Sequence, residues 1–156
     1  MNKKEFINSK VEMVDGVLLL NNQYALMYEH EKEEIQKQVK EICEKHKPKK
    51  VLEIGFGLGY SAEAFQEYGL DKHVIVEAHP EIYKKAHKWQ LEHKNYKNIE
   101  ILYEFIQDDK IDENEFDIVF DDRCELVYNV PQGMGFPYYK VTKESKSYSL
   151  PPIKSW

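Results

Sequence analysis

Residues 51–65 read VLEIGFGLGYSAEAF, an apolar run followed by three glycines at alternate positions and then by a predicted helix. A short apolar strand that turns at glycines into a helix is typical of the first unit of an open parallel sheet. The glycine loop then lies outside the carboxyl ends of the strands, where such sheets bind their ligands. This stretch therefore decides the fold and also points to the candidate site.

The segments on either side extend this unit into an alternation of strands and helices. Upstream, residues 11–20 predict a hairpin that turns at Asp15-Gly16, and residues 28–45 predict a surface helix. Downstream, helices are predicted over 60–68 and from 79 onward, and strands over 74–77, 99–102 and 116–120. The pattern indicates an α/β fold, a Rossmann-like parallel sheet with flanking helices, which we expect to be truncated after strand four.

Composition and charge exclude several classes of protein. With 156 residues, 42% hydrophobic and 32% charged, the chain has the size and balance of one globular domain, and no run approaches the roughly 20 apolar residues of a membrane helix. A net charge of −6 opposes binding to nucleic acid. The charged N-terminus MNKKEF lacks the apolar stretch of a secretory signal, so we expect a cytoplasmic protein. The cysteines and histidines show no metal-ligand spacing, and no metal is predicted.

The spacing of the glycines bears on the ligand. Gly55, Gly57 and Gly59 give G-x-G-x-G, whereas a dinucleotide fold needs G-x-G-x-x-G, and Tyr60 stands at the place of its third glycine. S-adenosylmethionine has no phosphate, and its methionine end needs backbone close by, which glycines permit. A dinucleotide such as NAD, or a tight turn with no ligand, stay open as alternatives.

Two acidic residues make the loop more specific. Glu53 lies inside a strand that should be buried on both faces, where an unpaired carboxylate costs several kcal/mol, so a cationic ligand group such as an ammonium is favoured. Glu77 ends the next strand, 20 residues after Gly57, and could accept both ribose hydroxyls, of S-adenosylmethionine or of NAD. Together with the glycines, the two acids favour S-adenosylmethionine.

Three motifs resemble those of a known class. VLEIGFGLG, VIVEAHPEIYKKA and EFDIVFDD are similar to the first, second and fourth motifs of class I S-adenosylmethionine-dependent methyltransferases. Within this class, the sequence most resembles guanidinoacetate N-methyltransferase and its bacterial relatives, through VLEIGFG, the M-x-x-x-E pattern of residues 27–31 and Phe120-Asp121. The resemblance implies an S-adenosylmethionine-binding core over residues 27–123, with an N-terminal hairpin segment over 1–26 and a Tyr/Pro-rich tail over 124–156.

The resemblance also implies an activity and roles for residues. The protein would methylate a guanidino or amino nitrogen of a small molecule or peptide, with Glu31 and Asp121 as catalytic residues that hold the cationic nitrogen group. For Glu31 the alternative is an acid at a helix start, favoured by the helix dipole. Asp122 and Arg123 are expected to form a surface ion pair with each other, with a role in binding the substrate as the alternative. Phe105 and Ile106 could form an adenine wall or belong to the core. The predicted cofactor-binding residues are Glu53, Gly55, Phe56, Gly57, Gly59, Glu77, Ala78, Phe105 and Ile106.

The end of the chain leaves other functions open. After Asp121 only 35 residues remain, too few for the three further strands and two crossover helices of the family fold. Either the Tyr/Pro-rich tail covers the fourth strand as an edge, or another chain completes the sheet. Because an uncovered edge would invite pairing, we expect a homo-oligomer or a partner protein that binds through residues 124–156. The alternatives are a non-catalytic S-adenosylmethionine-binding subunit, a cofactor-cleaving enzyme and an aminopropyl-transferring enzyme similar to spermidine synthases.

Overall fold

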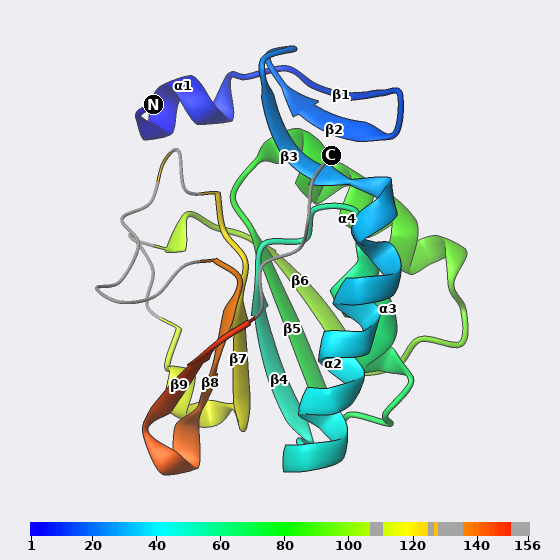
Figure 1. The fold of residues 1–156 in the computed structure, drawn as a ribbon, viewed down its shortest axis with the longest axis vertical. Helices are drawn as coiled ribbons and strands as arrows, with labels where there is room; N and C mark the ends of the chain where they lie inside the picture. Colours follow the sequence, from blue (N-terminus) through cyan, green and yellow to red (C-terminus); the bar gives the residue numbers. More distant parts are fainter. Residues whose placement is uncertain (107–110, 125–126, 128–135, 151–156) are drawn as a thin grey trace.

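The structure, a computed structural model, describes residues 1–106, 111–124, 127 and 136–150 (Figure 1). Its helices are α1 (Lys3–Ile7), α2 (Lys32–His46), α3 (Tyr60–Gln66) and α4 (Pro80–Glu92), with 3₁₀ turns at Glu29–Glu31, Glu113–Glu115 and Thr142–Glu144. The strands are β1 (Val11–Val14), β2 (Val17–Leu20), β3 (Tyr24–Tyr28), β4 (Lys50–Ile54), β5 (Lys72–Glu77), β6 (Ile99–Tyr103), β7 (Ile118–Asp121), β8 (Tyr138–Val141) and β9 (Lys146–Ser149).

The main sheet has six strands in the order β6-β5-β4-β7-β8-β9. Its first four strands are parallel, which confirms the predicted α/β fold and its Rossmann-like sheet. The chain runs outward from β4 to β6 on one side and returns to β7 on the other, so the strand order reverses beside β4 (Figure 1). The carboxyl ends of β4 and β7 at this reversal are where open sheets of this kind bind ligands.

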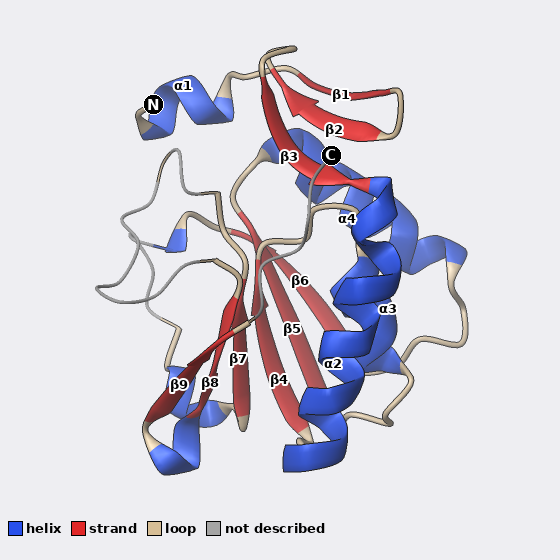
Figure 2. Cartoon of the chain, viewed as in Figure 1, coloured by secondary structure: helices blue, strands red, loops and turns tan. Residues whose placement is uncertain are grey.

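The central strand β4 is buried on both faces, as the continuous apolar run predicts. Val51 packs with side chains of α2, α3, β7 and β8, whereas Leu52 and Ile54 pack with β5 and β7 on the opposite face. Figure 2 shows α2, α3 and α4 on the same side of this sheet. Among the described residues, no helix is both long enough and apolar enough to cross a membrane.

The sheet does not end at β7. Part of the Tyr/Pro-rich tail covers this strand, which is one of the two alternatives given above, and the expectation that the sheet stops after the fourth strand is corrected. Strand β8 pairs antiparallel with β7, placing Asp121 opposite Tyr138, and β9 pairs with β8. The alternation of β8 is only four residues long, with Tyr139 and Val141 buried, and the turn to β9 carries Ser145 rather than glycine at positive φ. Such short strands with a weak turn signal escape pattern analysis. Because β8 covers β7, the argument for an oligomer loses its basis, and the oligomer stays a prediction.

A second sheet is formed by β1, β2 and β3 near the N-terminus. The predicted hairpin is confirmed, with Val14 opposite Val17 and with Asp15 and Gly16 at positive φ. Strand β3 was not predicted, and the helix expected from residue 28 begins at Lys32. The reason is that no residue of β3 is fully buried, so its sequence shows no alternation.

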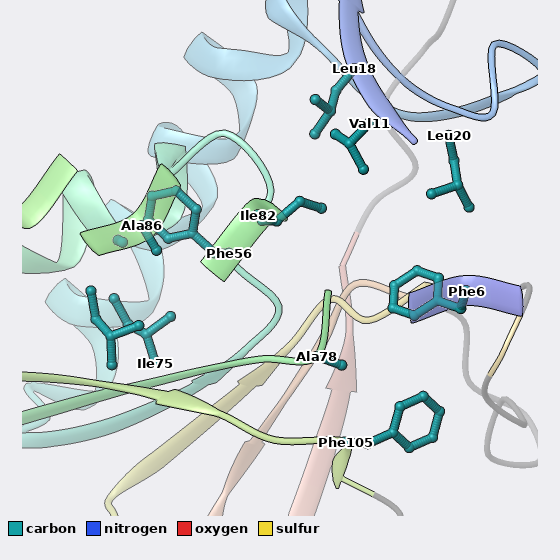
Figure 3. Close-up of a cluster of buried hydrophobic side chains, with 12 residues drawn as sticks. Phe6, Val11, Leu18, Leu20, Phe56, Ile75, Ala78, Ile82, Ala86 and Phe105 are labelled. Atoms are coloured by element: carbon teal, nitrogen blue, oxygen red, sulfur yellow. The ribbon is translucent and has the colours of Figure 1, made fainter. Parts of the chain in front are cut away.

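Apolar packing fixes this N-terminal sheet above the carboxyl edge of the main sheet. Phe6 of α1, Leu18 and Leu20 of β2, Ile82 of α4 and Phe105 after β6 belong to one buried cluster (Figure 3). The N-terminal elements therefore form a roof over the strand ends, and the space beneath them is the candidate site.

Candidate functional site

A cavity of about 860 Å³ lies between this roof and the carboxyl ends of the parallel strands. Its volume falls in the range of about 300–1,000 Å³ that is usual for small-molecule sites. Its described lining comes mainly from β3 and the start of α2, from the ends of β4, β5, β6 and β7 and the residues after them, and from the residues around β8 and β9, with single residues of α1, α3 and α4. The lining residues used below are Met27, Glu31, Ile54, Gly55, Phe56, Gly57, Glu77, Ala78, Glu104, Ile106, Asp122, Arg123, Phe136, Pro137 and Ser149.

The glycines of the loop after β4 allow close contacts within the protein. Gly55 has φ +95°, and a Cβ there would lie 2.6 Å from the backbone carbonyl oxygen of Asp122. Gly57 has φ +58°, and a Cβ would lie 2.9 Å from Cε of Met27. Gly59 does not line the cavity, and its missing Cβ leaves room for the Phe56 ring. The first two glycines thus bring β7 and β3 to the cavity.

Glu77 ends β5 and holds the glycine loop in place. Its Oε1 accepts a hydrogen bond from the Phe56 amide and its Oε2 from the His79 amide, both at 2.9 Å. Burial raises the pKa of the Glu77 carboxyl, although backbone hydrogen bonds act in the opposite direction. A carboxylate has about four acceptor positions, so each oxygen can also accept from a ligand hydroxyl. The position and chemistry of Glu77 therefore suit a vicinal diol.

Glu53 does not line the cavity. Its side chain is 1% exposed, and its Oε2 lies 2.6 Å from Nε2 of His73 on the neighbouring strand β5. The His73 ring also contacts the side-chain amide of Gln66 in α3, with Nδ1 2.8 Å from Nε2 of Gln66. The buried acid thus has a partner within the protein, and the structure does not bring it to the cavity. A polar His73 inside a second strand buried on both faces was the signal that could have revealed this pair.

Glu31 and Asp121 have different environments. Glu31 lines the cavity at the start of α2, and burial raises the pKa of its carboxyl, although a hydrogen bond from the Tyr28 amide partly offsets this. Asp121 is 1% exposed and is not among the lining residues. Its carboxylate pairs with Arg123 through both guanidinium Nε, at 2.9 Å, and Nη2. Tyr138 lies opposite Asp121 on β8, and its pKa is raised to about 12 by burial and by the Asp121 carboxylate.

The partner of Arg123 therefore differs from the expected one. The sequence suggested a surface ion pair with Asp122, but the structure pairs Arg123 with Asp121, and the side chain of Arg123 is only 18% exposed. Asp121 ends β7 with its carboxylate buried, and a buried charge needs a partner of opposite charge. Arg123, two residues away in the sequence, supplies that charge.

The other predicted residues divide between cavity and core. Phe56, Ala78 and Ile106 line the cavity, whereas Phe105 packs in the cluster beneath α1 with Lys3 above its ring. Glu104 was missed, although it directly follows β6 at the edge where Glu77 ends β5, and the same rule could have found it.

Carboxylates dominate the charge of the cavity. Among the described lining residues, Glu31, Glu77, Glu104 and Asp122 are acidic, and Arg123 is the one basic side chain. Such a cavity favours a ligand that carries positive charge.

Comparisons with known proteins agree with this architecture. A family model described as guanidinoacetate N-methyltransferase matches residues 24–140. No curated protein matches the sequence significantly. Three solved structures are each 22% identical: SAH-bound methyltransferase PaMTH1 of Podospora anserina (TM-score 0.47, 56% of this chain and 39% of that chain), YcgJ of Bacillus subtilis (0.47, 55% and 37%) and tRNA (m1A58) methyltransferase TrmI of Aquifex aeolicus (0.50, 73% and 57%).

These structures bear on the fold alone, and the chain spans less than two thirds of the length of each of them. The family model, in contrast, covers most of the chain, including the glycine loop, Glu77 and the strand that ends at Asp121. The chain therefore belongs to the guanidinoacetate N-methyltransferase family, with the Rossmann-like fold of class I methyltransferases.

Proposed function

We propose that the cavity binds S-adenosylmethionine and that the protein transfers its methyl group to a guanidino or amino nitrogen of a small molecule or peptide. The observation that carries the proposal is the meeting of the Gly55–Gly57 loop and Glu77 in one acidic cavity at the carboxyl edge of the sheet. A ligand with a sulfonium, an ammonium and a ribose diol matches this combination of close backbone, diol acceptor and negative charge.

Each part of the proposed cofactor site has a physical role. The loop at Gly55 and Gly57 would lie beside the methionine end, and the Glu77 carboxylate would accept the ribose hydroxyls. The backbone amides of Phe56 and His79 hold this carboxylate in place before any ligand arrives, which lowers the entropic cost of binding. Ala78 and Ile106 would contact the adenine. When bound, S-adenosylmethionine supplies an electrophilic methyl group.

Glu31 is the proposed catalytic residue that faces the acceptor. Its carboxylate would hold the nitrogen group of the acceptor and accept the proton that this nitrogen loses on methylation. Because burial raises the pKa of Glu31, its carboxylate takes up that proton more readily than an exposed one. Asp121, proposed from the family resemblance as the second catalytic acid, would contribute through Arg123, which lines the cavity.

A second candidate is a non-catalytic S-adenosylmethionine-binding role. It is favoured by the pairing of Asp121 with Arg123, which leaves Glu31 as the member of the proposed catalytic pair that lines the cavity.

Calorimetry with S-adenosylmethionine, followed by mass spectrometry of the same sample with a panel of amines and guanidines, tests the proposal. Saturable binding and a methylated acceptor are expected. Binding without transfer would support the second candidate, and cleavage of S-adenosylmethionine without an acceptor would indicate a lyase or hydrolase. The absence of binding would overturn both candidates.

A further inference from the structure

Arg123 is the only arginine in a chain that has 22 Lys and Arg residues. Its guanidinium contacts the Asp121 carboxylate through two parallel N–H groups, Nε toward Oδ1 and Nη2 toward Oδ2. A lysine ammonium cannot make this planar, two-pronged contact. The only arginine of the chain therefore occupies a position that requires a planar cation with two parallel N–H donors.

The surroundings of Asp121 complete a site for a planar cation. The carboxylate lies at the end of β7, is 1% exposed, and has Tyr138 opposite it on β8. The Phe136 ring lies 5.7 Å from the guanidinium carbon of Arg123, a distance at which a cation is attracted by the ring. A bidentate carboxylate, a phenol and an aromatic ring form a guanidinium-binding site.

We propose that Arg123 fills this site permanently and is thereby a specificity-determining residue. Its guanidinium excludes guanidino acceptors from Asp121. The acceptors are therefore amines, which Glu31 holds. The inference rests on the proposed methyltransferase function and narrows its acceptor.

Arg123 is a stronger competitor for Asp121 than a free guanidine. It is two residues away in the chain, and a tethered group acts at an effective concentration of about millimolar or higher. A free guanidine would also lose translational and rotational freedom on binding, a cost that Arg123 has already met in folding. If a free guanidine displaced Arg123, Arg123 would lose its contacts with both Asp121 and Phe136.

The remaining carboxylate suits an amine better than a guanidine. A guanidinium stays protonated up to a pKa above about 12, and its charge is delocalised over three nitrogens, so one carboxylate does little to free a lone pair. An alkylammonium has a pKa of about 10.4, and the loss of one proton leaves a lone pair localised on its nitrogen. Glu31 alone can hold such a group and take its proton.

Nuclear magnetic resonance of the native chain tests the occupancy directly. Because Arg123 is the only arginine, its Nε–H gives a single side-chain signal that needs no further assignment. We expect this signal to be protected from solvent exchange and to stay in place when millimolar methylguanidinium is added at constant ionic strength. A shift or a second signal that saturates with methylguanidinium would overturn the proposal.

Variants test the shape of the site. In Arg123→Ala, methylguanidinium should raise the unfolding temperature more than methylammonium does, whereas Asp121→Asn/Arg123→Ala should respond equally to both. The native chain, with its site filled, should show no preference. Equal responses of Arg123→Ala to the two cations would overturn the assignment. If Arg123→Ala does not fold, the resonance experiment on the native chain still decides.

Acceptor assays separate this inference from the proposed function. With S-adenosylmethionine, the native chain should methylate primary amines and not the matched guanidines, and Arg123→Ala should gain activity on guanidines. Preference of the native chain for guanidines would overturn the inference while the methyltransferase function stands. If no S-adenosylmethionine binds, the proposed function fails, and with it the acceptor class, whereas the occupancy of Asp121 is still judged by the resonance and thermal data.

Discussion

Met27 of β3 lies directly against Gly57, so that a Cβ on this glycine would stand 2.9 Å from Cε and 3.2 Å from Sδ of the methionine. At Gly55 the corresponding neighbour is the backbone carbonyl of Asp122, at 2.6 Å. A methionine side chain can change rotamer, whereas a backbone carbonyl moves only with its strand. Gly57 therefore packs against a side chain that can move, whereas Gly55 packs against backbone that cannot move by itself.

Substitution of the glycines should reveal this difference. We expect Gly57→Ala to lower the free energy of unfolding by about 1–2 kcal/mol, the cost of a left-handed residue, because Met27 can yield. Gly55→Ala should cost at least about 3 kcal/mol, since strain at φ +95° adds to a backbone clash. Urea unfolding measures both. Gly69→Ala is the matched control, because its φ is +61° and no atom lies within 4 Å of the added Cβ. Equal costs at Gly55 and Gly69 would contradict the packing argument.

Removal of the Glu77 carboxylate should weaken S-adenosylmethionine binding. Glu77→Ala deletes the proposed diol acceptor and leaves the Phe56 and His79 amides without their partner, so we expect affinity to fall at least about 100-fold, equivalent to about 2.7 kcal/mol. Calorimetry measures the affinity. Glu33→Ala, at an exposed position of α2 that does not line the cavity, removes the same charge and leaves these hydrogen bonds in place, so it should bind as the native chain does. Unchanged affinity in Glu77→Ala would remove this residue from the site.

Glu53 should affect stability rather than binding. Glu53→Gln replaces the buried acceptor of His73, and the change should lower the free energy of unfolding by about 1–3 kcal/mol. Because Glu53 does not line the cavity, S-adenosylmethionine affinity should stay within about twofold of the native value. Urea unfolding and calorimetry on the same preparation give both quantities. A large loss of affinity in a stably folded Glu53→Gln would restore the direct role that the sequence suggested.

Stability should fall as the pH falls below about 6.5, through His79. Its ring accepts a hydrogen bond from the Glu81 amide at Nδ1 and donates from Nε2 to the Ser9 carbonyl, and burial lowers its pKa from 6.5. The unfolded chain therefore binds a proton first, and stability decreases with falling pH until the lowered folded-state pKa is passed, by at most about 1.4 kcal/mol per pH unit.

A comparison with His79→Gln isolates this effect from other groups that titrate in the same range. The pKa of His46 is also lowered by burial, and the raised pKa of Glu77 acts with the opposite sign, because its folded-state carboxyl takes up a proton more readily. Thermal unfolding of both proteins between pH 7.5 and 5.5, as approximate limits, gives the difference. Parallel curves for the native chain and the variant would show that His79 does not contribute.

The parallel part of the fold could be predicted because its strands are buried on both faces and bounded by clear turns. β4 and β5 are mostly buried apolar residues, interrupted by Glu53 and His73, and Pro80 starts α4 at the first helical position, where proline is favoured. Strands β3, β8 and β9 escaped because they are four or five residues long and at most half of their residues are buried. Their pairing depends on neighbours that are distant in the sequence.

The candidate site shows the same division between local pattern and distant contact. The position of Gly55, Gly57 and Glu77 at strand ends follows from the pattern, and all three line the cavity. The partner of a buried acid does not follow from it. Glu53 bonds to His73 on the neighbouring strand, and Asp121 bonds to an arginine assigned to another residue. Register and side-chain reach decide these contacts, and neither is visible in one sequence.

The antiparallel return of β8 has a consequence for how this protein can diversify. Because β7 ends at the cavity and β8 begins there, the connection over residues 122–137 leaves and rejoins the sheet at the same edge, and Arg123 and Pro137 both line the cavity. Substitutions at Arg123 and Pro137 would change the wall of the cavity without changing the register of either strand. This wall of the cavity can therefore diverge between relatives, whereas the glycine loop and Glu77 depend on the architecture of the parallel strands.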